Sequence, residues 1–263
     1  MDHSTNTLKN ITVLVTRPEH QAEKLCQLIE SSGGKAIRFP SIEIVDVLDE
    51  EKLHLLIDQI STFDIAIFIS ANAVKFGIKH VLSRGKWPKS LKIAAVGKSS
   101  VKALDSLGLI ADIFPIEHFN SETLLSLEEM QNVAGKKIII FRGDGGRELL
   151  AETLISRGAI VEYANCYQRS LPDSDPTPLY RLWERDELDV IVTTSNEGLQ
   201  NLYDMVGEQG RHWLLCATIV VVSERAVGLA KRLGFMSKPI VTAQASDEAI
   251  LNSLIAWNSM QNT

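Results

Sequence analysis

Short apolar runs recur along this chain, and each is followed by a stretch with helical periodicity. The runs are rich in Ile and Val and cover residues 11–15, 65–69, 93–96, 137–141, 190–193 and 219–222. After the first run, Ala22, Leu25, Cys26 and Ile29 recur three or four residues apart on one predicted helix face, before a Gly-Gly stop. This alternation is typical of β-α-β units, and it predicts an α/β fold built on parallel sheets.

Two late helices have well-marked starts. Ser121-Glu122 and Ser246-Asp247 each place a serine before an acidic residue and an amphipathic stretch. A serine hydroxyl can accept a hydrogen bond from a free amide of the first turn, and a carboxylate there faces the positive end of the helix dipole. We therefore expect Ser121 and Ser246 to cap these helices.

The second half of the chain resembles the first at an offset of about 125 residues. Arg142 corresponds to Arg17 (142 − 17 = 125), Ser195 to Ser70 (195 − 70 = 125) and Ser223 to Gly97 (223 − 97 = 126), and each pair follows an apolar run. Solenoid repeats have much shorter periods, of about 20 to 50 residues. The spacing predicts one duplicated module, and hence two similar lobes, each a parallel sheet flanked by helices.

Residues 38–44 and 165–171 occupy matching positions in the two copies and are candidate connectors. If both are strands that pair with one another, they form a two-stranded interdomain connector. Domain 1 then comprises residues 1–37 and 172–263, and domain 2 comprises residues 45–164. Two sequential halves divided near residue 130 are the alternative.

Composition and charge argue against nucleic-acid binding and against a membrane span. The chain has 263 residues, of which 45% are apolar and 23% charged, with a net charge of −6. The charges are interspersed, which argues against the basic stripe of a nucleic-acid binder. The polar first ten residues and the absence of an apolar run of about 18 residues predict a cytoplasmic protein without a membrane span.

The common cysteine, histidine and glycine motifs are incomplete. Cys26, Cys166 and Cys216 are far apart and outside any CxxC pattern, so we expect buried thiols rather than a disulfide or a zinc site. None of the six histidines forms an HExxH motif or an i, i+4 histidine pair, so no metal site is expected. Lys92 and Glu148 stand where a P-loop and a dinucleotide fingerprint need glycine.

Small polar and basic residues instead follow the predicted strands. In parallel sheets, ligands bind beyond the carboxyl ends of the strands, where helix N-termini offer free amides. For any one serine or threonine, a simple capping role is the alternative, but repetition in two lobes favours an anion-binding cleft. The candidates are Thr16, Arg17, Ser70, Asn72, Gly97, Ser100, Arg142, Gly143, Ser195, Asn196 and Ser223.

The order of these motifs resembles the uroporphyrinogen-III synthase family from residue 11 to about 256. The matching stretches are Val15-Thr16-Arg17-Pro18, Ile69-Ser70-Ala71-Asn72, Ala95-Val96-Gly97, Phe141-Arg142-Gly143, Gly146-Arg147-Glu148-Leu149, Tyr167-Gln168-Arg169 and Thr194-Ser195-Asn196. The resemblance implies a monomeric hydro-lyase of haem biosynthesis without metal or organic cofactor. It would close hydroxymethylbilane into uroporphyrinogen III, losing water and inverting the last ring through a spiro intermediate.

The resemblance also implies roles for individual residues. Tyr167 matches the family's connector tyrosine, a candidate proton donor, although packing between the lobes is the alternative role. Ser100, Ser70 and Ser195 match hydroxyl-bearing positions. At Ser223-Glu224-Arg225 some members carry glycine, proline and threonine, so no hydroxyl role is transferred to Arg225.

Three arginines, one partner enzyme and two alternative functions are further expectations from the sequence. Arg17, Arg142 and Arg147 are candidates to pair with substrate carboxylates, with ordinary salt bridges as the alternative. Handover of hydroxymethylbilane from hydroxymethylbilane synthase is a further expectation. Two other functions stay open on the sequence: a non-catalytic two-lobed sensor for a small anion, and a nucleotide-sugar transferase.

Overall fold

The computed structural model describes residues 6–145 and 148–261, which form two compact units. Unit 1 comprises residues 1–43 and 170–263, and unit 2 comprises residues 44–169. The chain therefore enters unit 2 after Glu43 and returns to unit 1 at Ser170. Within the described residues, no helix is both long enough and apolar enough to cross a bilayer.

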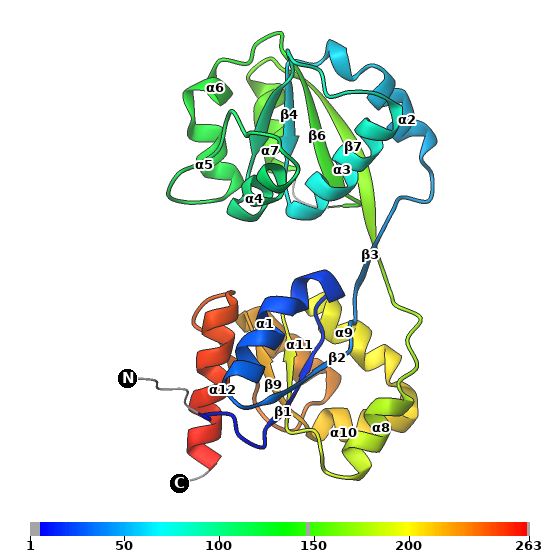
Figure 1. The fold of residues 1–263 in the computed structure, drawn as a ribbon, viewed down its shortest axis with the longest axis vertical. Coiled ribbons are helices and arrows are strands. Elements are labelled where there is room, and N and C mark those ends of the chain that lie inside the picture. Colours follow the sequence, from blue (N-terminus) through cyan, green and yellow to red (C-terminus); the bar gives the residue numbers. More distant parts are fainter. Residues whose placement is uncertain (1–5, 146–147, 262–263) are drawn as a thin grey trace. The chain divides into compact units, whose positions relative to one another are not determined.

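Unit 1 is a five-stranded sheet with helices on both faces (Figure 1). Its strand order is β10-β9-β8-β1-β2, and every neighbouring pair is parallel. The strands are β1 (Thr12–Val15), β2 (Lys35–Arg38), β8 (Val190–Thr193), β9 (Thr218–Val221) and β10 (Ile240–Val241). The helices are α1 (Glu19–Ser31), α8 (Thr177–Glu184), α9 (Asn196–Met205), α10 (Gly207–Cys216), α11 (Glu224–Leu233) and α12 (Asp247–Gln261).

The alternation of side chains along β1 explains why both faces of this sheet are covered. Val13 and Val15 are fully buried in one core with α1 and α12, whereas Leu14 is fully buried in the other core with α8 to α11. Because successive residues of a strand point to opposite faces, an all-apolar strand must be covered on both. The short unbroken apolar runs in the sequence reflect this two-sided burial.

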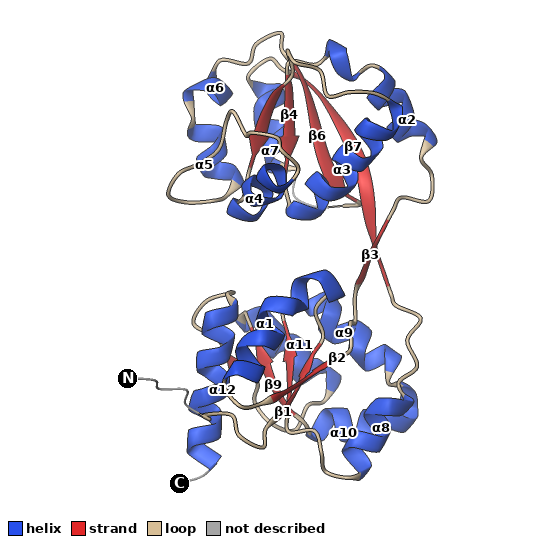
Figure 2. Ribbon diagram, in the orientation of Figure 1, coloured by secondary structure: helices blue, strands red, loops and turns tan. Residues whose placement is uncertain are grey.

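Unit 2 is also built on a five-stranded sheet, and its helices lie on both faces of the sheet (Figure 2). The strand order is β3-β7-β6-β4-β5. The strands are β3 (Glu43–Val45), β4 (Ile65–Phe68), β5 (Lys92–Ala95), β6 (Lys137–Gly143) and β7 (Ile160–Ser170). The helices are α2 (Glu51–Asp58), the 3-10 turn η1 (Ile60–Thr62), α3 (Ala71–Arg84), α4 (Lys98–Ser106), α5 (Ser121–Ser126), α6 (Glu128–Gln131) and α7 (Leu149–Ser156).

The strand orders confirm the duplication. The series β9-β8-β1-β2 in unit 1 corresponds to β5-β4-β6-β7 in unit 2. The first residues of corresponding strands differ by 218 − 92 = 126, 190 − 65 = 125, 137 − 12 = 125 and 160 − 35 = 125. The chain order is permuted, because unit 1 takes its first two strands from before unit 2 and the others from after it.

One of the two expected helix caps is wrong. The Ser246 hydroxyl accepts a hydrogen bond from the Ala249 amide at 3.2 Å, as expected. Helix α5, however, is capped by Asn120, whose Oδ1 accepts from the Thr123 amide at 2.7 Å. Ser121 is instead the first helical residue, since asparagine one position earlier offers an equally good cap acceptor.

The expectation of three buried thiols also needs one correction. Cys26 and Cys166 are buried, but Cys216 is exposed. Cys216 is the last residue of α10, and its sulfur lies 3.6 Å from Met236 Sδ. Burial raises the pKa of the Cys166 thiol to about 12, so that thiol stays protonated at neutral pH.

Candidate active site

The carboxyl ends of three adjacent strands meet at one edge of the unit 2 sheet. The strands β5, β4 and β6 are neighbours and parallel, and the chain leaves them near Gly97, Ser70 and Gly143. Gly97 and Ser70 precede the first residues of α4 and α3, and the Ser70 hydroxyl accepts from the Ala73 amide at 3.0 Å. This edge therefore carries two helix N-termini, which favour negative charge.

Tyr167 reaches this edge from β7. Its hydroxyl lies 3.1 Å from Ser70 Oγ, and the two groups share a hydrogen bond. Tyr167 is only 6% exposed, and its ring lies beside the ring of Phe76, with the centroids 5.9 Å apart. The phenol is thus held at a helix N-terminus by a second hydroxyl.

Gly143 makes room for the Tyr167 ring. The two residues are partners across β6 and β7, at a point where the register shifts after Arg142. A Cβ at residue 143 would lie 2.5 Å from Cε2 and 2.6 Å from Cζ of Tyr167, closer than real Cβ contacts allow. Glycine at 143 is therefore a requirement for the position of the tyrosine.

Arg142 is a buried cation at the same edge. It is 4% exposed, its Nη1 donates to Glu148 Oε1 at 3.0 Å, and its guanidinium lies 4.5 Å from the centroid of the Tyr163 ring. Among the described residues, its Nε finds no hydrogen-bond partner. A buried donor without a partner costs stability, so such a group is a candidate to bind a ligand.

Glu148 joins Arg142 to Tyr163. The Tyr163 hydroxyl donates a hydrogen bond to Glu148 Oε2. Burial, followed by the interactions with Glu148, raises the pKa of Tyr163 to about 12. Hydrogen bonds from Tyr163 and Arg142 hold the pKa of Glu148 below its ordinary value. At neutral pH, Glu148 is therefore the anion in this group and Tyr163 stays protonated.

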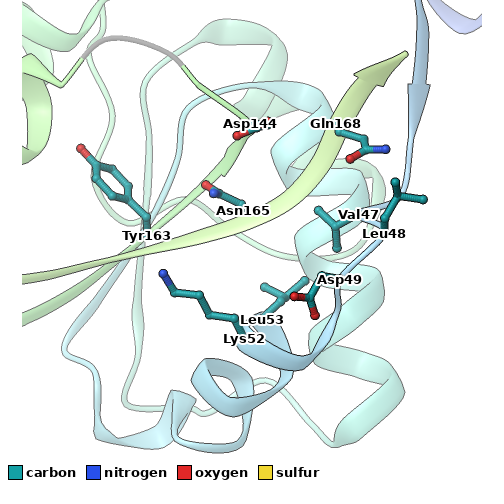
Figure 3. A pocket seen from close by; sticks show the side chains of 9 residues that line it. All are labelled: Val47, Leu48, Asp49, Lys52, Leu53, Asp144, Tyr163, Asn165 and Gln168. Carbon is teal, nitrogen blue, oxygen red and sulfur yellow. The ribbon is translucent and has the colours of Figure 1, made fainter. Parts of the chain in front are cut away.

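Two cavities lie near this edge. One, of about 190 Å³, lies beyond the ends of β4, β5 and β6 and is lined by Ile69, Val96, Ser121, Ile140, Arg142, Leu150 and Tyr163. The other, of about 280 Å³, lies on the flank of β7, where Asn165 and Gln168 face Lys52 and the segment before α2 (Figure 3). The smaller cavity lies at the strand ends, where ligands bind in parallel sheets, and the buried arginine lines it.

The other candidates in unit 2 differ in how far they are buried. Ser100 is fully buried in α4, and its hydroxyl has no hydrogen-bond partner in the described part of the chain. Asn72 lies in the first turn of α3 and is partly exposed. Arg147 lies outside the described residues.

Unit 1 places its candidates at the corresponding edge. Thr16, Ser195 and Ser223 follow β1, β8 and β9, which are neighbours in the sheet. The Thr16 hydroxyl is buried and donates to the Val192 carbonyl at 3.0 Å. Ser195 caps α9 by accepting from the Gly198 amide at 2.9 Å, and Ser223 precedes α11 without such a bond from its side chain.

The two remaining candidates of unit 1 differ in burial. Arg17 forms an ion pair with Asp247 at the start of α12, and both side chains are largely buried. For Arg17 the structure thus shows the salt bridge that the sequence left open as an alternative. Asn196 is the exposed first residue of α9.

The partners of Arg142 escaped the sequence analysis. Glu148 was noted as the residue that breaks a glycine fingerprint and as part of a stretch resembling the family, but it was not a site candidate, and neither was Tyr163. Tyr163 and Arg142 are 21 positions apart (163 − 142 = 21) and meet only because β6 and β7 pair. A spacing motif cannot detect a contact of this kind.

The duplicated parallel sheets, with polar groups at the carboxyl edge of each, define the class of two-lobed α/β enzymes. The family model for uroporphyrinogen-III synthase HemD matches residues 23–252. Uroporphyrinogen-III synthases of Escherichia coli and Salmonella typhimurium are each 35% identical over 249 residues, covering 93% of this chain and 100% of theirs. The chain belongs to the uroporphyrinogen-III synthase family, and it is a cyclising lyase of porphyrin biosynthesis.

Solved structures agree in fold. A uroporphyrinogen III synthase from Thermus thermophilus matches with a TM-score of 0.57 at 17% identity, covering 96% of this chain and 100% of that one. The uroporphyrinogen-III synthetase from Helicobacter pylori matches with a TM-score of 0.57 at 13% identity, covering 94% of this chain and 99% of that one. These likenesses show the fold, while the family assignment rests on the sequence relatives. A non-catalytic sensor is not supported.

Proposed function

We propose that this enzyme converts hydroxymethylbilane into uroporphyrinogen III and that Tyr167 donates the proton to the leaving hydroxyl. One observation carries this proposal: the Tyr167 phenol lies beside Ser70 at the edge where α3 and α4 begin. A phenol is a hydrogen-bond donor at neutral pH, and an acid in reach of the leaving oxygen accelerates its departure.

Ser70 and the N-terminus of α3 stabilise the negative charge that develops on the Tyr167 oxygen. When the phenol gives its proton to the substrate hydroxyl, water leaves and negative charge forms on the tyrosine oxygen. The Ser70 hydroxyl, 3.1 Å away, then donates to that oxygen, and the N-terminus of α3 stabilises the same charge. Loss of a proton from the cyclised product restores the phenol.

The cation left by departure of water is reactive, so geometry decides the product. Attack by the substituted carbon of the last ring forms a spiro intermediate, which opens and closes again with that ring inverted. The enzyme must hold the chain of pyrroles so that this carbon is the one presented. The carboxylates of the substrate are the handles for such positioning.

Arg142 is the strongest candidate to bind one of these carboxylates. It is buried, its Nε lacks a partner among the described residues, and it lines the cavity at the strand ends. Ser70, Ser100 and the first amides of α3 and α4 add weaker contacts, each helix end contributing about 0.3 to 1 kcal/mol. Several weak contacts suit a ligand with many carboxylates.

The assembly and domain limits are part of the same proposal. The enzyme acts as a monomer and receives hydroxymethylbilane from hydroxymethylbilane synthase. Its domains are residues 1–37 with 172–263, and residues 45–164, joined by connectors 38–44 and 165–171. The neighbouring positions of β3 and β7, and the division of the chain at residues 43 and 170, support these limits.

Tyr167→Phe tests the proton donor. We expect kcat for hydroxymethylbilane consumption to fall by about 100-fold, while loss of the single bond to Ser70 lowers the free energy of unfolding by only about 1 kcal/mol. Tyr180→Phe is the matched control, because the Tyr180 hydroxyl also makes one bond, to the Val206 carbonyl at 2.8 Å in unit 1. An unchanged kcat in Tyr167→Phe would remove Tyr167 from the mechanism.

A further inference from the structure

A cluster of metal-ligand side chains lies on unit 2, away from the strand ends. Glu50, His54 and His80 bring one ligand atom each to within 4.8 Å of one another. Glu50 and His54 are one helical turn apart, with Glu50 Oε2 3.2 Å from His54 Nε2. His80 comes from α3, and its ring centroid is 5.7 Å from that of His54.

The cluster runs from the surface to a buried histidine. The side chains of Glu50 and His54 are 44% and 28% exposed, whereas that of His80 is 5% exposed. A small ion can therefore approach from solvent past Glu50 and His54. The inner ligand is fixed by packing in α3, and the outer two have room to adjust.

Asp46 holds His80 in place. Its Oδ1 is 2.5 Å from His80 Nε2, and its Oδ2 is 2.6 Å from Lys79 Nζ. A carboxylate hydrogen-bonded to a ligating histidine fixes the ring and makes it a better ligand. The positive charge of Lys79 neutralises the negative charge of Asp46. The carboxylate of Glu50 then gives the cluster a net charge of −1, which attracts a cation.

The ligand types select the metal. Two imidazoles and one carboxylate suit Zn²⁺ and similar transition-metal ions, whereas Mg²⁺ and Ca²⁺ prefer oxygen ligands alone. With Zn–N and Zn–O bonds of about 2.0 to 2.2 Å, ligand atoms on a tetrahedral ion are about 3.3 Å apart. Glu50 Oε2 and His54 Nε2 already have this spacing, at 3.2 Å. Rotation of these two partly exposed side chains can bring their ligand atoms to the same distance from the ligand nitrogen of His80.

We propose that Glu50, His54 and His80 form a binding site for one Zn²⁺ ion, with Asp46 orienting His80 and water completing the coordination. The ion joins the start of α2 to α3. It takes no part in the proposed cyclisation, so this inference goes beyond the proposed function and is independent of it. The histidine spacing in the sequence does not indicate this site, because His80 is 26 positions after His54 (80 − 54 = 26) and the two meet only in the folded unit.

Zinc titration of the untagged protein tests the proposal. All proteins carry Cys216→Ser, which removes the one exposed thiol among the described cysteines as a competing ligand. We expect the parent protein to take one Zn²⁺ from a chromophoric chelator and its melting temperature to rise by about 5 °C at saturating Zn²⁺. His54→Ala should abolish both effects, and Asp46→Asn should weaken binding by about tenfold.

His212→Ala is the matched control, since His212 is an exposed helical histidine of unit 1 and should leave zinc binding unchanged. His54 is chosen over His80 because its exposed side chain can be removed without opening the core. A crystal soaked with Zn²⁺ should show an anomalous peak about 2.0 to 2.1 Å from a nitrogen of each of His54 and His80. Failure of the parent protein to bind Zn²⁺, or equal binding by His54→Ala, would overturn the proposal.

Discussion

At the scale of single residues, the position of Tyr167 depends on the small size of its neighbours Gly143 and Ser70. Gly143 has no Cβ where the ring needs space, and Ser70 is small enough to cap α3 and still meet the phenol hydroxyl at 3.1 Å. The sequence indicated Ser70 by its place after a predicted strand and Tyr167 through a family resemblance. The need for glycine at 143 follows only from the pairing of β6 and β7, which no local pattern contains.

Gly143→Ala should therefore impair the enzyme through Tyr167. A methyl group 2.5 Å from Cε2 must displace the ring, and a shift of about 1 Å in a catalytic group can lower the rate by about 100-fold. We expect kcat for hydroxymethylbilane to fall by that factor and the free energy of unfolding to fall by about 1 to 3 kcal/mol.

Gly228→Ala is the control for this substitution. Gly228 lies in α11, and a Cβ there would meet only Arg232 Nη1, at 3.8 Å. Alanine at 228 should leave kcat unchanged and raise stability by about 1 kcal/mol, because alanine favours helix. If Gly143→Ala retained full activity, the position of the Tyr167 ring would not matter for catalysis.

At the scale of elements, the contacts of Arg142 come from the residue before α7 and from β7. Arg142 lies one residue before the end of β6, and Glu148, just before α7, pairs with its guanidinium. Tyr163 on β7 holds Glu148 in place through its hydroxyl. Strand and helix positions were predictable from periodicity, but this three-residue contact depends on the sheet order.

Glu148→Gln tests whether Glu148 competes with substrate for Arg142. The variant keeps the shape and removes the charge, so a substrate carboxylate meets a free guanidinium. The Glu148 side chain is 52% exposed, so water weakens its pair with Arg142, and we expect KM for hydroxymethylbilane to fall by about two- to fivefold with kcat unchanged. Glu152→Gln, one turn further along α7, removes an equal charge as a control and should leave KM unchanged. A raised KM in Glu148→Gln would show that Glu148 itself helps to hold the substrate.

At the scale of the whole molecule, the duplication accounts for most of what the sequence could predict. Six apolar runs predicted the positions of six strands, because buried parallel strands need no polar face. These strands are β1, β4, β5, β6, β8 and β9. The offset of 125 residues between Ser70 and Ser195 gave the equivalence of the two units. The partner of Arg17, which is Asp247, and the cluster of Glu50, His54 and His80 could not be predicted, because each joins residues that are distant in sequence and close only after folding.

The isomer of the product tests the central claim most directly. Freshly made hydroxymethylbilane is mixed with the purified enzyme, and the uroporphyrinogen isomers are resolved by chromatography. We expect uroporphyrinogen III, with the last ring inverted, to form faster than the spontaneous reaction. Formation of the uninverted isomer alone, at the spontaneous rate, would contradict the account.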